Sequence, residues 1–239
     1  AVTPNTRAII INSPSNPTGS AYDKKELETI AECALRNKIL IVSDEIYEKI
    51  VFDGFEQYSI CAIGKEIQNN SILINGVSKS YAMTGWRIGY LAANKNIIKQ
   101  IGKLQGQSTS NPTSISQAAS IVALNEGEAE VQRMVDEFQK RRDVLMECLL
   151  SIPSVTCYKP MGSFYTFPNF SAFYGKLFKG KKVEGSIQLA KFLLEEGNVA
   201  LVPGVAFGAD KNLRMAFASS MDTIRQGVDR IVKTLELLG

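Results

Sequence analysis

The stretch that decides the fold is residues 39–47, ILIVSDEIY. Four apolar residues are followed at once by three polar ones, and a short apolar run of this kind is typical of a buried β-strand. The run is too short to span a bilayer. Residues 24–37, just before it, carry apolar side chains at helical spacing, with Asp23 and Glu26 placed as a capping box. The sequence therefore predicts a helix and then a buried strand that ends in polar groups.

The same alternation continues on both sides of this stretch. Apolar segments at residues 7–12, 71–75 and 88–92 predict three more buried strands. Apolar strands that alternate with helices favour an α/β layer with a mostly parallel sheet. In such sheets ligands bind at the carboxyl ends of the strands, so polar residues that directly follow a strand are the first candidates for a functional site.

The character of the sequence changes near residue 127. Residues 128–150 form a long, highly charged stretch whose apolar residues fall mostly on one helical stripe. Shorter elements are predicted after it: strands at 155–158, 164–167 and 213–218, and helices at 187–196 and 221–238. We therefore expect the C-terminal part of a large α/β domain at residues 1–126. A smaller α+β domain is expected at residues 127–239, introduced by the long helix.

Composition excludes several classes of function. The 239 residues carry a formal net charge of +3, and basic and acidic residues are interspersed, so neither a nucleic-acid-binding tail nor a membrane patch is predicted. The chain has no histidine, which excludes Ser–His and Cys–His catalytic pairs and histidine metal sites within it. Its four cysteines are far apart, so we expect no disulfide framework and a reducing compartment, the cytoplasm.

Three charged residues lie next to predicted strands. Asp44 directly follows residues 39–43, where it either faces a ligand crevice or caps the next turn. Lys79 follows the third strand among small residues that let the backbone approach a ligand, although a lysine in a loop is usually a solvated surface charge. Arg87 precedes the fourth strand, where a guanidinium can hold a phosphate or form a structural ion pair. None of the three identifies a function alone.

The loop at residues 12–19, NSPSNPTG, is the fourth candidate. Asn-Pro and Thr-Gly are ordinary turn residues, so the loop needs no function to explain it. However, its two prolines make it rigid, and a rigid loop at a strand end can present the Asn16 amide to a ligand at little ordering cost.

Taken in order, these segments resemble a known family. NPTG at 16–19, SDEIY at 43–47, SK at 78–79 and MTGWRIGY at 83–90 resemble the fold-type I pyridoxal-phosphate aminotransferases of class I/II, in particular their aspartate aminotransferase-like branch. The resemblance covers the whole chain and extends to NLRMAFA at 212–218, where the family places an arginine in a strand. It implies a three-layer large domain, present in part, and a small C-terminal α+β domain.

The resemblance also implies residue roles around pyridoxal 5′-phosphate. Lys79 would bind the cofactor aldehyde and then move the substrate proton, while Asp44 would hold a proton on the pyridine nitrogen. Asn16 and Tyr47 would contact the phenolic oxygen, and Ser78 and Arg87 would contact the phosphate. Arg214 would bind the substrate carboxylate, and Asn16 is also assigned to substrate binding. Because one lysine serves as anchor and base, the lack of histidine causes no difficulty.

The sequence departs from the family in two respects. Gly76 stands where many members have serine, so one phosphate-binding hydroxyl is expected to be absent. Family members are also longer at the N-terminus, so we interpret the chain as the C-terminal part of an aminotransferase that would bind cofactor weakly alone. Ser110 and Asn111 resemble a segment that approaches the neighbouring subunit's active site.

The predicted function is transamination between an L-amino acid and a 2-oxo acid, with aspartate and glutamate the favoured pair, in amino-acid metabolism and biosynthesis. Other reactions on the same fold stay open, namely β-elimination by a C–S lyase and chemistry like that of aminocyclopropane-carboxylate synthase. A non-catalytic fragment is the alternative from another class. The resemblance further implies a homodimer, and we expect no metal, nucleic-acid or membrane partner.

Overall fold

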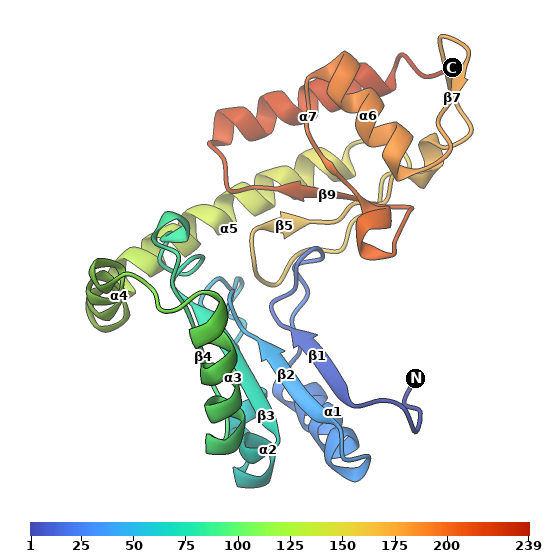
Figure 1. Ribbon diagram of the computed structural model, residues 1–239. Coiled ribbons are helices and arrows are strands. Elements are labelled where there is room, and N and C mark those ends of the chain that lie inside the picture. Colours follow the sequence, from blue (N-terminus) through green and yellow to red (C-terminus); the bar gives the residue numbers. More distant parts are fainter. The chain divides into compact units, whose positions relative to one another are not determined.

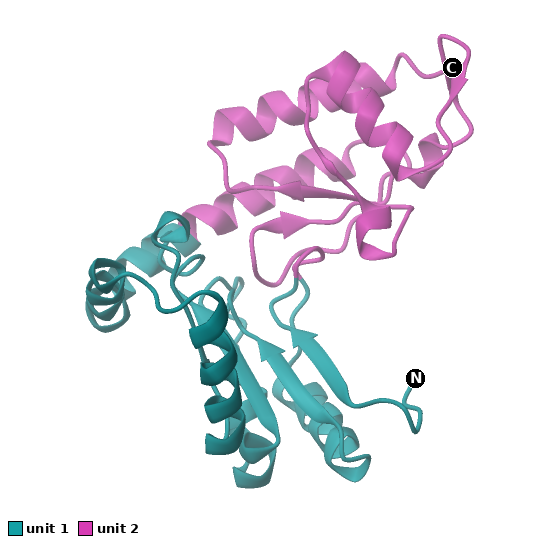
Figure 2. Ribbon diagram, in the orientation of Figure 1, with its two compact units in different colours: residues 1–15, 20–135 teal, residues 16–19, 136–239 magenta.

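The computed structural model describes residues 1–239, and the chain forms two compact units (Figure 2). Unit 1 comprises Ala1–Ser15 and Ser20–Val135, and unit 2 comprises Asn16–Gly19 and Asp136–Gly239. No helix of the structure is both long enough and apolar enough to cross a membrane.

Unit 1 is built on a four-stranded sheet in the order β1-β2-β3-β4 (Figure 1). Its strands are β1 (Ala8–Asn12), β2 (Leu40–Asp44), β3 (Ser71–Gly76) and β4 (Gly89–Ala92). The first three are parallel and β4 is antiparallel to β3. The predicted α/β class with a mostly parallel sheet is confirmed. All three parallel strands end at the same edge of the sheet.

Helices lie along both faces of this sheet. α1 (Lys24–Arg36) and α2 (Lys65–Asn69) pack on one face, and α3 (Lys95–Ser108) lines a cavity with β3 and β4 on the other. One apolar cluster joins α1 and α2 to the sheet, and its buried members are Ile11, Leu27, Ala31, Ala34, Ile39, Ile41, Ile60 and Ile67. Burying each large side chain of this cluster stabilises the fold by about 2 kcal/mol. The unit therefore has the layers that the resemblance implies.

The start of α1 confirms a local prediction. The Asp23 carboxylate accepts from the backbone N–H of Glu26 at 2.8 Å, and the Glu26 carboxylate accepts from the backbone N–H of Asp23 at 2.9 Å. This reciprocal pair is the predicted capping box. It satisfies two donors that would otherwise lack a partner at the helix start.

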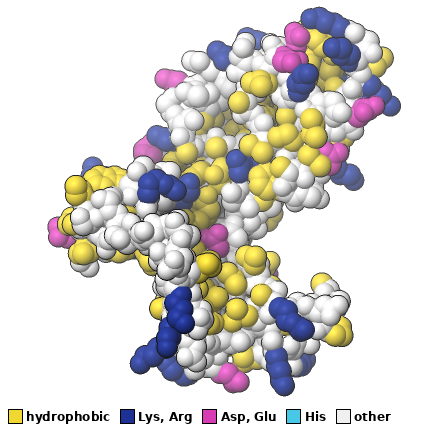
Figure 3. Space-filling model, viewed as in Figure 1, with side chains coloured by type: hydrophobic (Ala, Val, Ile, Leu, Met, Phe, Trp, Pro, Cys, Tyr) yellow, Lys and Arg dark blue, Asp and Glu magenta, His cyan; other side chains and the backbone are white.

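The prediction of a buried strand at residues 7–12 is wrong for one face of β1. Ile11 is buried against α1, but Ile10 is 76% exposed, and Ile74 on β3 is 38% exposed. Successive strand residues point to opposite faces. α1 and α2 cover the face that carries Ile11, whereas α3 on the other face lies over β3 and β4 only, so Ile10 on β1 stays uncovered there. Hydrophobic side chains are accordingly visible on the surface of unit 1 (Figure 3).

Unit 2 combines a small antiparallel sheet with long helices, which is the α+β character that was predicted. The sheet has the order β5-β9-β8, formed by β5 (Tyr165–Thr166), β9 (Leu213–Ala216) and β8 (Val202–Pro203). A hairpin of β6 (Leu177–Phe178) and β7 (Lys181–Lys182) lies apart from it. The helices are α5 (Glu128–Leu150), α6 (Ser186–Gly197) and α7 (Met221–Leu235), with α4 (Ser114–Glu126) before them in unit 1.

The strand predicted at residues 155–158 does not form. Thr156 makes a single isolated bridge to Asn169, and Asn169 makes a second one to Asn212. Asn169 thus connects Thr156 to Asn212 through single bridges. Residues 155–158 therefore add no strand to the sheet. The helices predicted at 128–150 and 187–196 are confirmed as α5 and α6.

The division between the units falls inside α5, between Val135 and Asp136. The first turns of this helix belong to unit 1, because Glu128 forms an ion pair with Lys49 and Val131 lines a cavity together with Tyr81. The domains expected at residues 1–126 and 127–239 stay a prediction.

Candidate active site

Asp44 is the last residue of β2 and lies at the carboxyl-end edge of the sheet. It pairs in register with Asn12 on β1 and with Ile74 on β3, so the ends of three parallel strands meet beside it. No helix follows; the Asp44 Oδ1 atom accepts from the backbone N–H of Ile46 at 3.2 Å in a turn. Asp44 therefore caps the turn that follows β2, although no helix begins there, and its carboxylate keeps a second oxygen for a ligand.

Glu45, the next residue, was not singled out in the sequence. Its side chain is buried and its Oε1 atom accepts from the hydroxyl of Ser43 at 2.9 Å and from that of Ser59 at 2.8 Å. Burial raises the pKa of this carboxyl above its usual range, and the two hydroxyls oppose that shift. Glu45 anchors the turn that carries Asp44 and Tyr47, and Tyr47 is itself buried.

Lys79 lies in the turn that follows β3. This turn is closed by the backbone N–H of Tyr81, which donates to the carbonyl of Val77 at 3.3 Å, and by that of Ala82, which donates to the carbonyl of Lys79 at 3.2 Å. Asp44 on β2 pairs with Ile74 on the neighbouring β3, so Asp44 and Lys79 belong to the same edge of the sheet.

The antiparallel pairing of β3 and β4 brings Ser78 and Arg87 together. Gly76 pairs with Gly89, so Ser78 and Arg87 each lie two residues beyond the last pair. The Thr84 hydroxyl donates to the carbonyl of Ser78 at 3.0 Å, and Arg87 Nη1 donates to the carbonyl of Thr84 at 2.8 Å. These bonds tie an exposed guanidinium, through Thr84, to the backbone of Ser78 at the Lys79 turn.

Gly76 has a steric reason to replace serine. A Cβ atom at this position would lie 2.8 Å from the carbonyl oxygen of Ile88 and 3.2 Å from the Cδ1 atom of Ile46. The first contact is with backbone and cannot be relieved by a side-chain rotation. The close approach of β3 and β4 therefore requires glycine, which explains the departure from the family pattern.

In unit 2, Arg214 projects from β9 and is fixed by three groups. Its Nη1 atom donates to Asn16 Oδ1 at 2.9 Å. The guanidinium carbon also lies 4.5 Å from the ring centre of Tyr165 and 5.2 Å from that of Phe207. Such cation–π contacts orient a guanidinium without using its other N–H donors. The two predicted residues Asn16 and Arg214 are thus direct partners.

Tyr165 and Phe207 were not predicted as site residues. Tyr165 is buried in β5, and its ring also faces Arg214. Phe207 is the last residue of a short 3-10 helix, Gly204–Phe207. The only signal in the sequence was an aromatic residue before a glycine, which does not identify a guanidinium partner.

The predicted substrate loop, Asn16–Gly19, is held by the segment after Pro160. The backbone N–H groups of Met161 and Gly162 both donate to the carbonyl of Gly19, at 2.8 and 2.9 Å. Gly19 has φ +70°, and a Cβ atom there would lie 2.5 Å from Pro160 Cβ. Both facts require glycine and explain the conformation of the loop.

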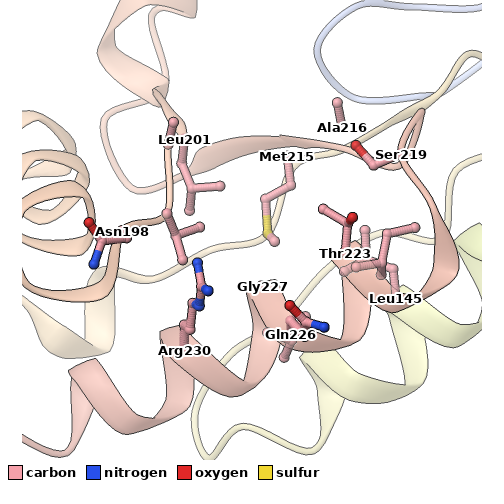
Figure 4. A pocket seen from close by; sticks show the side chains of 14 residues that line it. Leu145, Asn198, Leu201, Met215, Ala216, Ser219, Thr223, Gln226, Gly227 and Arg230 are labelled. Atoms are coloured by element: carbon pink, nitrogen blue, oxygen red, sulfur yellow. The ribbon is translucent and has the colours of Figure 1, made fainter.

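A cavity of about 320 Å³ in unit 2 is separate from these residues. It lies between β9 and α7 and is lined by Met215, Thr223 and Arg230 among others (Figure 4). Met215 points into it, and neighbouring strand residues point to opposite faces, so the side chain of Arg214 lies on the other side of the sheet. The cavity contains none of the predicted site residues.

Unit 1 carries polar side chains at its strand ends, and unit 2 carries an oriented arginine on β9. The family model described as "Aminotransferase class I and II" matches residues 1–231. The chain therefore belongs to this family, whose members depend on pyridoxal 5′-phosphate.

Individual relatives agree. The aspartate aminotransferase of Geobacillus stearothermophilus is 46% identical over 236 residues, which are 99% of this chain and 59% of that protein. The crystal structure of the Rhizobium meliloti aspartate aminotransferase matches with a TM-score of 0.95 at 39% identity, covering 100% of this chain and 60% of that one. An aromatic aminotransferase from Pyrococcus horikoshii matches at 0.90 and 35%, covering 98% and 61%. The chain thus spans about 60% of the length of such relatives.

Proposed function

We propose that this chain carries the lysine and the substrate-binding arginine of an aminotransferase that moves an amino group between an L-amino acid and a 2-oxo acid. Aspartate and glutamate are the favoured pair, as the names of several relatives suggest. The observation that carries the proposal is the meeting of Asp44, Ser78, Lys79 and Arg87 at one edge of the unit 1 sheet.

The donor set at this edge fits pyridoxal 5′-phosphate. Lys79 offers an amine for the aldehyde, Asp44 a carboxylate for the pyridine nitrogen, and Ser78 with Arg87 a hydroxyl and a guanidinium for the phosphate. The proposal also assigns Asn16 and Tyr47 to the phenolic oxygen. When bound, the cofactor supplies an electron sink for the carbanion formed at the amino acid's Cα.

The protein's own residues would do the rest of the chemistry. Asp44 keeps the ring nitrogen protonated, because a nearby negative charge favours the charged form of a base. Lys79 Nζ would take the proton from the substrate Cα as a general base. Once protonated, it would act as a general acid. Arg214 binds both oxygens of the substrate α-carboxylate, and its bond to Asn16 and its two ring contacts hold the fork ready.

The proposal extends to the setting of the enzyme. Domains at residues 1–126 and 127–239 are expected from the sequence pattern, and a cytoplasmic location from the cysteines. A role in biosynthesis and a homodimer are implied by the resemblance. Sedimentation of the natural full-length polypeptide that contains this sequence would test the last of these, and a monomer at micromolar concentration would contradict it.

Borohydride reduction followed by mass spectrometry tests the cofactor site. In the full-length polypeptide saturated with pyridoxal 5′-phosphate, we expect a pyridoxyl adduct on Lys79 and none in the Lys79→Ala variant. An unmodified Lys79 would reject the enzyme hypothesis and favour a non-catalytic protein.

A single-turnover experiment separates transamination from elimination. With aspartate and no oxo acid, a transaminase converts its cofactor to the pyridoxamine form and releases one equivalent of oxaloacetate. A lyase would leave the cofactor unchanged and release ammonia. We expect the first outcome, because the similar proteins described above are aminotransferases.

A further inference from the structure

Arg142 in α5 is the largest side chain of the molecule that is completely buried, with an exposure of 0%. Removing a guanidinium from water is costly, and replacing a buried ion pair with apolar side chains of similar volume is often neutral or stabilising. Stability alone therefore gives a weak reason for an arginine at this position. Its hydrogen bonds suggest a different reason.

The guanidinium connects α5 to the segment that follows Lys159. Arg142 Nη1 donates to the carbonyl of Pro160 at 3.0 Å. Its Nε and Nη2 atoms both donate to Asp143 Oδ1, at 3.0 and 2.7 Å, and this oxygen also lies 3.5 Å from Lys159 Nζ. Asp143 therefore fixes the direction of the fork, and the fork fixes the position of Pro160.

The segment at Pro160 in turn fixes the substrate loop. The backbone N–H groups of Met161 and Gly162 hold the carbonyl of Gly19, as described above. A Cβ atom on Gly19 would meet Pro160 Cβ at 2.5 Å, so the loop and the segment are in direct contact. A displacement of Pro160 has to displace Gly19.

Both the loop and the segment contact Arg214. The loop that contains Gly19 also contains Asn16, whose Oδ1 atom accepts from Arg214 Nη1 at 2.9 Å. The segment that contains Pro160 continues into β5, where the Tyr165 ring lies 4.5 Å from the guanidinium of Arg214. Two of the three groups that orient Arg214 thus come from segments next to Pro160.

We propose that Arg142 is a positioning residue for substrate-carboxylate binding, acting on Arg214 through Pro160, the Asn16–Gly19 loop and Tyr165. The proposal rests on the proposed function of Arg214. Arg142, a buried residue of α5, thus affects substrate affinity without contacting the substrate.

The test compares Arg142→Met and Arg142→Lys with the matched control Arg141→Met in the full-length holoenzyme. We expect Arg142→Met to raise the dissociation constant for succinate, measured by calorimetry, about tenfold, with kcat at saturating aspartate changed less than about threefold. Arg142→Lys keeps a donor for Pro160 and should recover part of the affinity. Arg141→Met, which removes the neighbouring arginine, should match the wild type.

Two further measurements keep the test independent of folding and of activity. Asp143→Asn changes a half-exposed side chain and should raise the succinate dissociation constant in the same direction by a smaller factor. Amide hydrogen exchange at Met161 and Gly162 should accelerate in both Arg142→Lys and Asp143→Asn. A merely structural arginine would lower the melting temperature and leave the affinity of the folded protein unchanged.

The outcomes separate this proposal from the function on which it rests. If Arg214→Lys weakens succinate binding but folded Arg142→Met or Asp143→Asn binds it as the wild type does, the positioning role is overturned. If Arg214→Lys also leaves succinate binding unchanged, the proposed function of Arg214 fails. Should Arg142→Met not fold, Arg142→Lys and Asp143→Asn decide.

Discussion

The Lys79 turn of unit 1 and the Arg214 site of unit 2 are assembled over different distances along the chain. The bonds that connect Ser78, Thr84 and Arg87 join residues six and three positions apart. The bond between Asn16 and Arg214 joins residues 198 positions apart. The first site follows from two adjacent strands and their turn, whereas the second exists only once unit 2 has folded. We expect variants of the Lys79 turn to lower kcat and variants of the Arg214 site to weaken substrate binding.

Lys79→Ala should have the largest effect. Removing both the covalent anchor and the general base should lower kcat by at least about 1,000-fold, since positioned proton transfer alone contributes 100- to 10,000-fold. Steady-state kinetics of the full-length polypeptide would measure this, with the exposed Lys103→Ala as the control. The comparison of the two sites fails if kcat is retained.

Arg214→Lys should produce the opposite pattern. A lysine keeps the charge but loses the fork that binds both carboxylate oxygens, so KM for amino acid and oxo acid should rise about 10- to 100-fold. Cofactor absorbance should remain unchanged, since Arg214 is not assigned to the cofactor. Arg225→Lys on the exposed side of α7 is the matched control. An unchanged KM would remove Arg214 from the substrate site.

Gly76→Ser tests the packing beneath the Lys79 turn. The added Cβ would lie 2.8 Å from a backbone oxygen, and overpacking of this kind costs about 1–3 kcal/mol of unfolding free energy. Gly85→Ser, in the connection between β3 and β4, is the control, because a Cβ there meets nothing within 4 Å. Urea denaturation would measure both variants. Equal stabilities would contradict the steric explanation for glycine at position 76.

Glu45→Gln should have the smallest effect, and one that depends on pH. Burial raises the pKa of Glu45 in the folded protein, so the folded state binds this proton more tightly than the unfolded state. Stability from this group is therefore present at low pH and is lost as pH rises through the raised pKa. Glutamine cannot ionise, but its oxygen can still accept from Ser43 and Ser59.

The melting temperature of Glu45→Gln relative to the wild type should accordingly increase from pH 4 to pH 8. Glu66→Gln, an exposed carboxylate on α2, provides the control. A constant difference across this range would show that the Glu45 carboxyl does not titrate abnormally.

Some of the structure was predictable because its causes are local. The capping box of α1 involves Asp23 and Glu26 only, and the helical spacing of Leu27, Ala31 and Ala34 reflects the face that packs on the sheet. Asp44 comes one residue after an apolar run, so its place at a strand end could be inferred. The exposure of Ile10 could not, because an apolar strand residue does not show which layers will cover it.

The sequence by itself determined the strands of the unit 1 sheet, their polar ends and the ordered motifs that identify the family, since these depend on neighbouring residues and on the periodicity of apolar side chains. Only the tertiary structure decided which groups orient Arg214, why position 76 must be glycine and that Arg142 is buried. Each of these depends on a contact between segments that are distant in the chain. Such a contact is formed by packing and leaves no pattern in the local sequence.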